Sequence, residues 1–525
     1  MDLKTFLHNL HFDTDKARPP DFEVDWDDAP LAYKLYRGLP TFPLSSDVPL
    51  TLEGQRPASL PDLRDIGHFL WYAYGLTALS QSGFVGGGDP GTHVTQVYRR
   101  FAPSGGALYP NELYVYLNIE EIPCGVYHYD VAHHRLVLLR EGQFHPYLTQ
   151  ALANRCNVSR CFGAIFVSTM FWKNYYKYNN FAYRLQGLDA GALMGQVLEV
   201  SRRFGFESAV YFQFLDNAVN HLLGLSEREE SVYAVIPLSV EPAGSWFTVT
   251  PTGGKTTCAT ALCRALPSVQ HEHYVRSRSV QDYPMLIQMN EASKLETVPP
   301  CAGQQGRQNC CGDSTVSLPC VTPTFYDFAA VCRSRYSPGT DFVLGKIPQE
   351  KFAMLLKETT QAFSYRTDLN LDGVQGALPR VSLYVCLYGV EGVEDGAYCY
   401  DPAAHVLRQI RPGDHRFRLQ DGMSMHNVNL SQVPLCFHVA GDRDHWKPSL
   451  GYRGYRIQQM EAGMLVQRLL LAVSAMGMNG HPLLGFDAEI CDDIYKMVPQ
   501  GITSLIQIPV GPYRLGSKLE GGLHA

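Results

Sequence analysis

The sequence predicts an α+β fold that is present twice in one chain of 525 residues. The chain resembles itself at an offset of about 270 residues, because Gly-Val-Tyr-His-Tyr-Asp at 125–130 recurs as Gly-Ala-Tyr-Cys-Tyr-Asp at 396–401. A second block, from Tyr183 to Gly205, recurs in the same order from Tyr455 to Gly477. In both copies, short strand patterns precede a long segment with apolar residues at helical spacing. We therefore expect two tandem domains that pack as an intramolecular pseudo-dimer, since a two-fold homodimer can be fused into one chain.

The elements of each copy follow one order. Two apolar strand patterns come first, and a long helix that ends at a glycine comes later, as is typical of a helix stop. In the first copy we expect a helix over 63–79, strands over 112–119 and 125–129, and a helix over 188–204 that ends at Gly205. In the second copy we expect strands over 380–388 and 396–400 and a helix over 460–476 that ends at Gly477.

A segment of different composition separates the copies. Residues 271–323 are rich in Ser, Gln, Gly, Pro and Cys and show no periodicity, which is typical of a linker or an inserted surface segment. The sequence thus predicts an N-terminal domain over 1–245, a linker or insertion over 246–324 and a C-terminal domain over 325–525.

Composition and charge exclude several classes of protein. Hydrophobic residues make up 45% and charged residues 18%, so the chain has enough apolar material for sizeable cores. The net charge of −7 argues against a nucleic-acid partner, because non-specific binding to phosphates needs a basic face. No run of about 18 apolar residues is present, and the N-terminus lacks the apolar core of a signal peptide. We expect a cytoplasmic protein that does not enter a membrane.

The 14 cysteines predict buried thiols rather than a disulfide framework. Several of them lie singly within apolar segments, at Cys124, Cys332, Cys386 and Cys436. The cluster Cys301, Cys310, Cys311 and Cys320 has one adjacent pair, long arms and no nearby His, whereas zinc sites use close pairs such as Cys-x-x-Cys. We expect a flexible insertion there and no metal site.

The most distinctive short segment is Pro-Ser-Gly-Gly-Ala-Leu-Tyr-Pro at 103–110, just before the expected strand. Adjacent glycines let a backbone approach a ring or a phosphate closely, and Ser104 adds a hydroxyl. An ordinary tight turn before a strand remains the alternative. The aligned stretch at 373–379 keeps Gly-Ala-Leu but loses Pro-Ser and the paired glycines. A second glycine cluster, at 86–91, lacks the Lys-Ser/Thr of a phosphate-binding loop, so we interpret it as a loop.

These motifs resemble those of a known family. The stretch from Arg100 to Val115 is similar to the signature of the SagB-type dehydrogenases, which are azoline oxidases of the FMN-dependent nitroreductase superfamily. The resemblance extends over nearly the whole chain. Its other parts are Tyr-Lys-Leu-Tyr-Arg at 33–37, the blocks at 125–130 and 177–191, Val-Cys-Arg-Ser-Arg-Tyr at 331–336 and His-Pro-Leu-Leu-Gly-Phe-Asp at 481–487.

The resemblance implies an FMN between two nitroreductase-like domains. The second copy would bind the phosphate through Arg333, Ser334 and Arg335, and the flavin edge through Leu484 and Gly485. The first copy would contribute Pro103, Ser104, Gly105 and Gly106. Arginine suits a phosphate because its planar donors form paired hydrogen bonds. A solvated pair remains the alternative for Arg333 and Arg335. The opposite pair of motifs is incomplete, with only Tyr-Arg-Gly at 36–38 as a partial opening, so we expect one FMN per chain.

For catalysis, Lys177 and Tyr178 resemble the Lys-Tyr pair of the same enzymes, and Ser449 and Leu450 stand at the repeated position. Burial lowers the pKa of a lysine, so Lys177 could accept a proton while Tyr178 orients or relays it. Lys173 is a rival, and an aromatic lid with no catalytic role is the other interpretation. The sequence departs from the family pattern at Asn-Asn-Phe, 179–181, which leaves the substrate specificity open.

The resemblance implies an oxidoreductase that converts a thiazoline or oxazoline ring of a peptide, or of a carrier-bound peptide, to a thiazole or oxazole in natural-product biosynthesis. Molecular oxygen is the expected electron acceptor, and a cyclodehydratase or synthetase is the partner that this function implies. One alternative is an NAD(P)H-dependent nitroreductase or another flavin dehydrogenase. Another is a non-catalytic scaffold in a peptide-modifying complex.

Overall fold

The computed structural model describes residues 1–85, 92–251, 257–299, 306, 312, 314–322, 325–361, 364–370, 380–515 and 519–523. The glycine cluster at 86–91, the stretch at 373–379 and Cys301, Cys310 and Cys311 lie outside the described residues.

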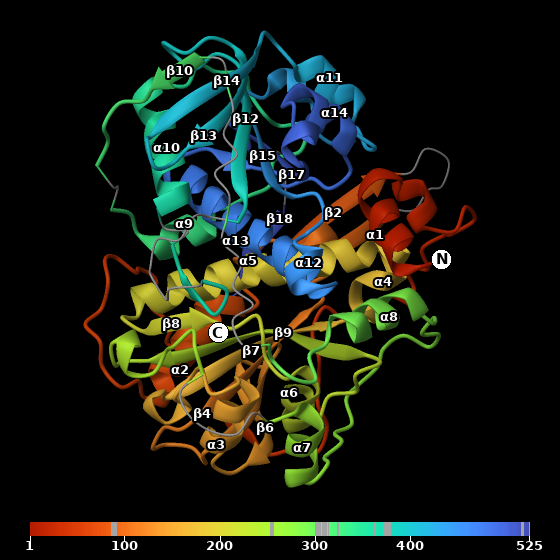
Figure 1. Ribbon diagram of the computed structural model, residues 1–525, viewed down its shortest axis with the longest axis vertical. Coiled ribbons are helices and arrows are strands. Elements are labelled where there is room, and N and C mark those ends of the chain that lie inside the picture. The colour runs from red at the N-terminus through yellow and green to blue at the C-terminus, as the bar shows by residue number, and fades with distance from the viewer. Residues whose placement is uncertain are drawn as a thin grey trace.

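The described residues form three sheets with helices around them, which confirms the predicted α+β class (Figure 1). The first sheet has the order β1-β6-β5-β4-β7-β9-β8-β11, the second β10-β14-β13-β12-β15-β17-β16 and the third β18-β2-β3. The strands of the first half are β1 (Thr41–Pro43), β2 (Ala78–Val85), β3 (Thr92–Arg99), β4 (Asn111–Leu117), β5 (Gly125–Asp130), β6 (Arg135–Glu141), β7 (Gly163–Met170), β8 (Glu207–Val210) and β9 (Glu230–Ser239). The remaining strands are β10 (Ser314–Ser317), β11 (Arg366–Thr367), β12 (Ser382–Leu387), β13 (Gly396–Asp401), β14 (Val406–Pro412), β15 (Leu435–Asp442), β16 (Asn479–Gly480), β17 (Ile502–Gly511) and β18 (Leu519–Gly522).

The helices lie between and beside these sheets. Up to the middle of the chain they are α1 (Leu3–Phe12), α2 (Leu63–Tyr74), α3 (His145–Ala151), α4 (Trp172–Tyr178), α5 (Ala182–Arg203), α6 (Asp216–Leu223), α7 (Ala259–Ala265) and α8 (Pro284–Ser293). They continue with α9 (Phe328–Ser334), α10 (Gln349–Gln361), α11 (Arg416–Asp421), α12 (Lys447–Leu450), α13 (Arg453–Ala475) and α14 (Ala488–Ile494).

The repeat seen in the sequence is a repeat of structure. The series β4, β5, β6, α3, β7, α5, β8, α6 and β9 recurs as β12, β13, β14, α11, β15, α13, β16, α14 and β17. Isolated bridges fall at matching positions, Tyr211 to Val235 in the first half and Leu483 to Gln507 in the second. The offset at this point of the fold is therefore 272 residues, and structurally equivalent residues can be compared directly.

The long helices α5 and α13 pack against each other between the two large sheets (Figure 1). A Cβ atom added at Gly191 would overlap the carbonyl of Met460, and one added at the equivalent Gly463 would overlap that of Leu188. Only glycine permits this close approach of two backbones. The two halves thus share one buried helix pair at their centre.

Short segments also cross from one half to the other. Strand β11 extends the first sheet beyond β8, and β18, near the C-terminus, pairs with β2. Helix α8 lies within the segment predicted as a linker, yet its Leu286 and Met289 are fully buried. Helix α8 packs against α1 and α13. Because its position depends on these tertiary contacts, the Ser- and Gln-rich segment around it shows little periodicity of apolar residues.

Several element boundaries differ from prediction; the helix expected over 460–476, for example, begins seven residues earlier, at Arg453. The helix expected over 63–79 ends at Tyr74, because the chain turns at Gly75 and enters β2 at Ala78. The helix expected over 188–204 begins six residues earlier, at Ala182. Among the described residues, no helix is long and apolar enough to cross a bilayer.

Candidate active site

The glycine-rich loop at 103–106 has a backbone that its sequence explains. Gly106 has φ of 63°, in the left-handed region that glycine enters without strain. Ser104 Oγ donates a hydrogen bond to Asp189 Oδ2 (2.5 Å) and accepts one from the backbone N–H of Tyr109 (2.9 Å). The N–H of Gly105 donates to Asp189 Oδ1 (3.1 Å). Asp189 of α5 therefore fixes the loop by accepting hydrogen bonds from both Ser104 and Gly105.

Asp189 is itself unusual, because it is a buried carboxyl among neutral donors. Burial raises the pKa of Asp189 to about 7, although the hydrogen bonds from Ser104 and Gly105 act in the opposite direction. None of the sequence motifs predicted a role for Asp189. Its equivalent in α13 is Glu461, and a carboxyl repeated within two buried helices is a signal that could have identified it.

Lys177 and Tyr178, at the end of α4, lie against this loop. A Cβ atom at Gly106 would stand 2.5 Å from Tyr178 Oη and 2.9 Å from Lys177 Nζ, so no side chain fits there. Within the described residues Lys177 Nζ has no carboxylate or hydrogen-bond acceptor, and it lies 5.1 Å from the ring centroids of both Trp26 and Tyr178. Burial lowers the pKa of Lys177 and raises that of Tyr178.

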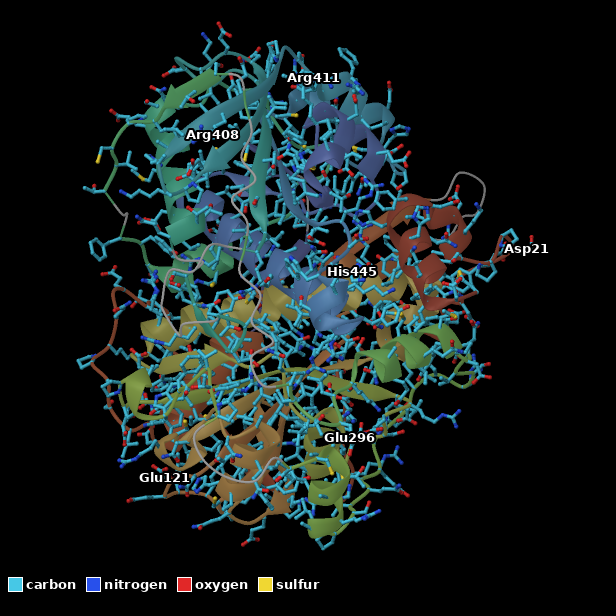
Figure 2. All side chains as sticks on the ribbon, in the orientation of Figure 1. Asp21, Glu121, Glu296, Arg408, Arg411 and His445 are labelled. Carbon is cyan, nitrogen blue, oxygen red and sulfur yellow. The ribbon has the colours of Figure 1, made fainter. Side chains whose placement is uncertain are left out.

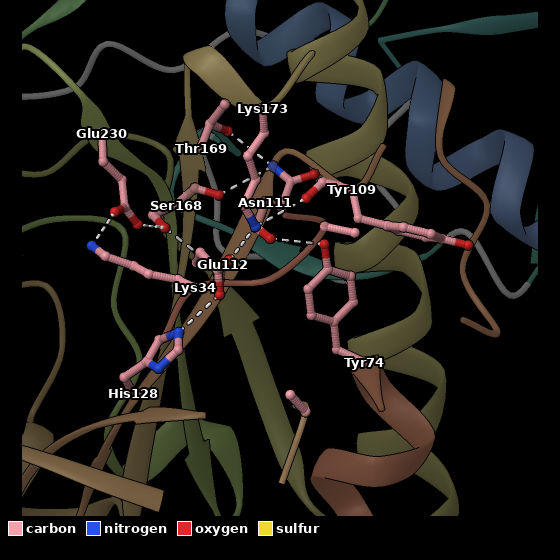
Figure 3. A network of polar contacts seen from close by, with 12 residues as sticks. Lys34, Tyr74, Tyr109, Asn111, Glu112, His128, Ser168, Thr169, Lys173 and Glu230 are labelled. Carbon is pink, nitrogen blue, oxygen red and sulfur yellow. Dashed lines mark hydrogen bonds and ion pairs between the residues drawn. The ribbon is translucent and has the colours of Figure 1, made fainter. Parts of the chain in front are cut away.

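Lys173, the other candidate for the proton acceptor, belongs to a buried network of polar side chains (Figure 3). Its ammonium contacts the Glu112 carboxylate and donates to the carbonyl of Tyr109 (3.4 Å). The second oxygen of Glu112 accepts from His128 Nε2 (2.8 Å). Burial alone would raise the pKa of Glu112, but Lys173 and His128 outweigh it and hold that pKa well below its usual range. Lys173 thus anchors α4 to β4, and its charge is already compensated.

A second buried ion pair extends this network. Lys34 Nζ donates to Glu230 Oε2 (2.7 Å), and the other oxygen of Glu230 accepts from Ser168 Oγ (2.5 Å) and Tyr114 Oη (2.9 Å). All four side chains are buried, so each charge has its partner within the protein. The motif at 33–37 therefore supplies a structural lysine in the first half.

The motif at 333–335 lies at the end of α9 and reaches into the first half. Arg335 Nε donates to the carbonyl of Phe101 (2.8 Å), two residues before Pro103, and Arg333 donates to the carbonyl of Leu50 (2.5 Å). Ser334 Oγ lies 2.9 Å from Ser474 Oγ of α13. Arg335 is thus next to the glycine-rich loop at the junction of the halves, whereas Arg333 contacts the first half at Leu50.

Leu484 and Gly485 lie in the loop after β16. Within the described residues their backbone N–H groups have no acceptor, while the carbonyl of Gly485 accepts from the N–H of Ser424 (3.0 Å). No direct contact joins this loop to 103–106 in that part of the chain. The connection runs through Asn479, whose Oδ1 accepts from the N–H of Tyr336 (3.0 Å), the residue after Arg335.

The equivalent loop of the first half has a different environment. The N–H groups of Phe212 and Gln213 each donate to the carboxylate of Asp368 (2.9 Å). Glu461, the counterpart of Asp189, pairs with Arg380 in place of a serine loop (Nε to Oε1, 2.9 Å). In the first half, Asp368 thus satisfies the two amides whose equivalents at 484–485 have no acceptor among the described residues. In the second half, Arg380 pairs with Glu461, whose equivalent Asp189 binds the glycine-rich loop.

The donor set tests whether these residues fit the FMN that the resemblance implies. Two free amides at 484–485 suit the acceptor atoms along a flavin edge, and two arginines suit a phosphate. The backbone at Gly105 and Gly106 has no side chain that would keep a flat ring away. The residues fit the group. In the part of the chain that the structure describes, no cluster of three or more His, Cys, Asp or Glu side chains is arranged to hold a metal ion.

Several known proteins are similar to this chain in sequence or in fold. Residues 57–238 match the nitroreductase family. The trifolitoxin-processing protein TfxB of Rhizobium leguminosarum bv. trifolii is 30% identical over 139 residues, which cover 25% of this chain and 37% of that protein. A Methanocaldococcus jannaschii protein named as a nitroreductase is 25% identical over 138 residues, 26% of this chain and 67% of that protein. A solved structure from Anabaena variabilis, also named as a nitroreductase, has a TM-score of 0.73 at 23% identity and covers 98% of this chain and 99% of its own. The last similarity shows that both halves together have a known fold.

Proposed function

We propose that this chain, whose residues 57–238 form a nitroreductase-family domain, is an FMN-dependent oxidoreductase that aromatises thiazoline or oxazoline rings in a peptide. The observation that carries the proposal is the contact of Lys177 and Tyr178 with Gly106, which joins a desolvated lysine to the glycine-rich loop. The similarity to a trifolitoxin-processing protein supports a peptide substrate, within the 37% of that relative which the match covers.

Residues from both halves would hold the cofactor. Arg333, Ser334 and Arg335 would bind the phosphate, Leu484 and Gly485 would donate to the ring edge, and Pro103, Ser104, Gly105 and Gly106 would line the ring from the first half. When bound, FMN supplies the hydride acceptor of the reaction.

Lys177 is the proton acceptor of this proposal. Aromatisation would break two C–H bonds on neighbouring ring carbons and form a C=C bond: one hydrogen would leave as a hydride, which bound FMN would accept, and the other would leave as a proton to Lys177 Nζ. Burial lowers the pKa of Lys177, which increases the neutral fraction able to accept the proton. Burial raises the pKa of Tyr178, so its hydroxyl stays protonated and can donate a hydrogen bond that orients the ring.

Two measurements test this function. The purified protein should show a flavin spectrum, and a thiazoline peptide incubated with it in air should lose two hydrogen atoms by mass spectrometry. A colourless protein that FMN does not reconstitute would refute the proposal. Rapid bleaching of the flavin by NADPH, with no change in the azoline peptide, would instead favour an NAD(P)H-dependent reductase.

A further inference from the structure

Trp26 is a large apolar side chain that the fold leaves in solvent, with 59% of its surface exposed. Tryptophan is usually well buried, and an exposed one beside a candidate active site needs an explanation. Its ring centroid lies 5.1 Å from Lys177 Nζ, and the ring meets that of Tyr176 edge-on at 6.3 Å. The indole therefore forms part of the surface around the proposed proton acceptor.

The loop around Trp26 is built to present it. Asp25 Oδ1 accepts hydrogen bonds from the N–H groups of Asp27 (3.1 Å) and Asp28 (3.2 Å), which is an Asx turn with Trp26 inside it. The Asp28 carboxylate in turn accepts from the N–H groups of Arg278 (2.6 Å) and Ser279 (2.9 Å). The side chain is thus presented by a fixed turn. Asp21, five residues earlier in the chain, lies at the edge of the molecule in Figure 2.

The same turn is tied to the helix that carries Lys177. Trp172 Nε1 of α4 donates to Ser277 Oγ (2.9 Å), which donates to the carbonyl of Asp28 (2.7 Å). Trp26 and Lys177 are therefore held in a constant relation to each other. A residue placed in this way can contact a substrate whose reacting atoms lie at Lys177.

The distances indicate which part of the substrate that is. Lys177 Nζ would be 2.9 Å from a Cβ atom at Gly106 and is 5.1 Å from the Trp26 ring. The ring that gives up its proton must touch Lys177, and the indole, 5.1 Å from the same Nζ, is close enough to contact a group next to that ring.

We propose, on the basis of the function proposed above, that Trp26 contacts the residue that flanks the reacting ring. An exposed indole face gains most from an apolar or aromatic side chain. Trp26 is therefore a specificity-determining residue, and the substrate class is a peptide with an aromatic or large apolar residue next to the azoline.

The test compares peptides that carry Phe or Ser on either side of one thiazoline. For the wild-type holoenzyme, the kcat/KM ratio of Phe to Ser should be about tenfold at one of the two positions, which corresponds to about 1.4 kcal/mol. Trp26→Ala should reduce this ratio to near one through a higher KM for the Phe peptide, and Trp26→Phe should keep most of it. Phe417→Ala, which removes another exposed aromatic from α11 of the other half, should leave the ratio unchanged. Flavin content and melting temperature of each variant confirm that it is folded.

A second measurement does not depend on turnover. The affinity of the matching thiazole product peptide, followed by fluorescence anisotropy, should weaken about tenfold in Trp26→Ala for the Phe peptide only. A wild-type Phe-to-Ser ratio of kcat/KM that is equal at both positions, or a ratio that Trp26→Ala leaves unchanged, would overturn the proposed role of Trp26 but not the proposed function. Failure of the wild type to oxidise any azoline peptide would overturn the proposed function together with it.

Discussion

The amides of Leu484 and Gly485 and those of Phe212 and Gln213 occupy equivalent places in the repeated fold, but their partners differ. The first pair has no acceptor among the described residues, whereas the second donates to Asp368. An amide that has no acceptor within the protein is open to a ligand, whereas an amide that already donates to a side chain is not. The repeated fold thus contains this pair of amides twice, and in the first half the carboxylate of Asp368 already serves as their acceptor.

The largest expected effect comes from Lys177, which has no charged equivalent in the second half. Lys177→Ala should lower azoline turnover by about 10²–10⁴-fold, the usual contribution of a positioned general base, while FMN content stays the same. Steady-state kinetics against a thiazoline peptide checks this. Ser449→Ala at the equivalent position is the control and should have no effect. Equal loss in both variants would contradict the assignment.

The buried network of the first half predicts a large effect on stability. Lys173→Met removes the lysine partner of the buried Glu112 carboxylate, leaving only His128 beside it, and should lower the free energy of unfolding by about 3–5 kcal/mol. Arg418→Met, which breaks the exposed pair with Asp493, should cost about 1 kcal/mol or less. Urea unfolding of both variants makes the comparison. A loss for Lys173→Met no larger than that for Arg418→Met would show that Lys173 does not anchor α4.

Asp189 predicts a pH dependence of stability. Because the folded pKa of Asp189 is raised to about 7, the unfolded chain releases this proton at lower pH than the folded protein. Its contribution to stability is therefore greatest below about pH 4 and falls by a few kcal/mol as the pH rises to about 7. Asp189→Asn should remove this decline. The melting temperatures of Asp189→Asn, measured from pH 4 to 7.5, should therefore approach or cross those of the wild type near pH 7.5. Parallel curves for the two proteins would refute the raised pKa of Asp189.

A smaller expected effect comes from two glycine substitutions. Gly106→Ala and Gly477→Ala both place a side chain at positive φ, which by itself should cost about 1 kcal/mol in the free energy of unfolding, and Gly106→Ala should cost more. Nothing lies within 4 Å of the added atom at Gly477, whereas at Gly106 it meets Tyr178 and Lys177. Only Gly106→Ala should therefore lose turnover as well. Similar activity in the two variants would mean that the close approach at Gly106 has no part in the reaction.

Much of the fold could be predicted because it is periodic. The strands at 125–130 and 396–401 carry the same apolar pattern in both copies, and Gly205 and Gly477 follow the helices α5 and α13. Elements that depend on tertiary contact could not be predicted in this way. Helix α8 is buried by other helices, and β2 begins only four residues after α2 ends.

The site was predictable only in part. Short motifs identified Ser104, Lys177 and Arg335, and the structure places all three around the loop at 101–106. Asp368 and Trp26 were missed, because a single carboxyl or tryptophan has no spacing that indicates a partner distant in the chain. Asp189 was missed too, although its repeat as Glu461 was a usable signal. Their roles depend on which segments meet in the folded protein.

The central claim is that the two halves form one FMN site together, and cofactor content per chain tests it most directly. Mass spectrometry and absorbance of the reconstituted protein should give about one FMN per chain, and Arg335→Ala in the second half should bind FMN more weakly although Ser104 and Gly106 are intact. Two equivalents per chain, or full retention of FMN in Arg335→Ala, would contradict the account.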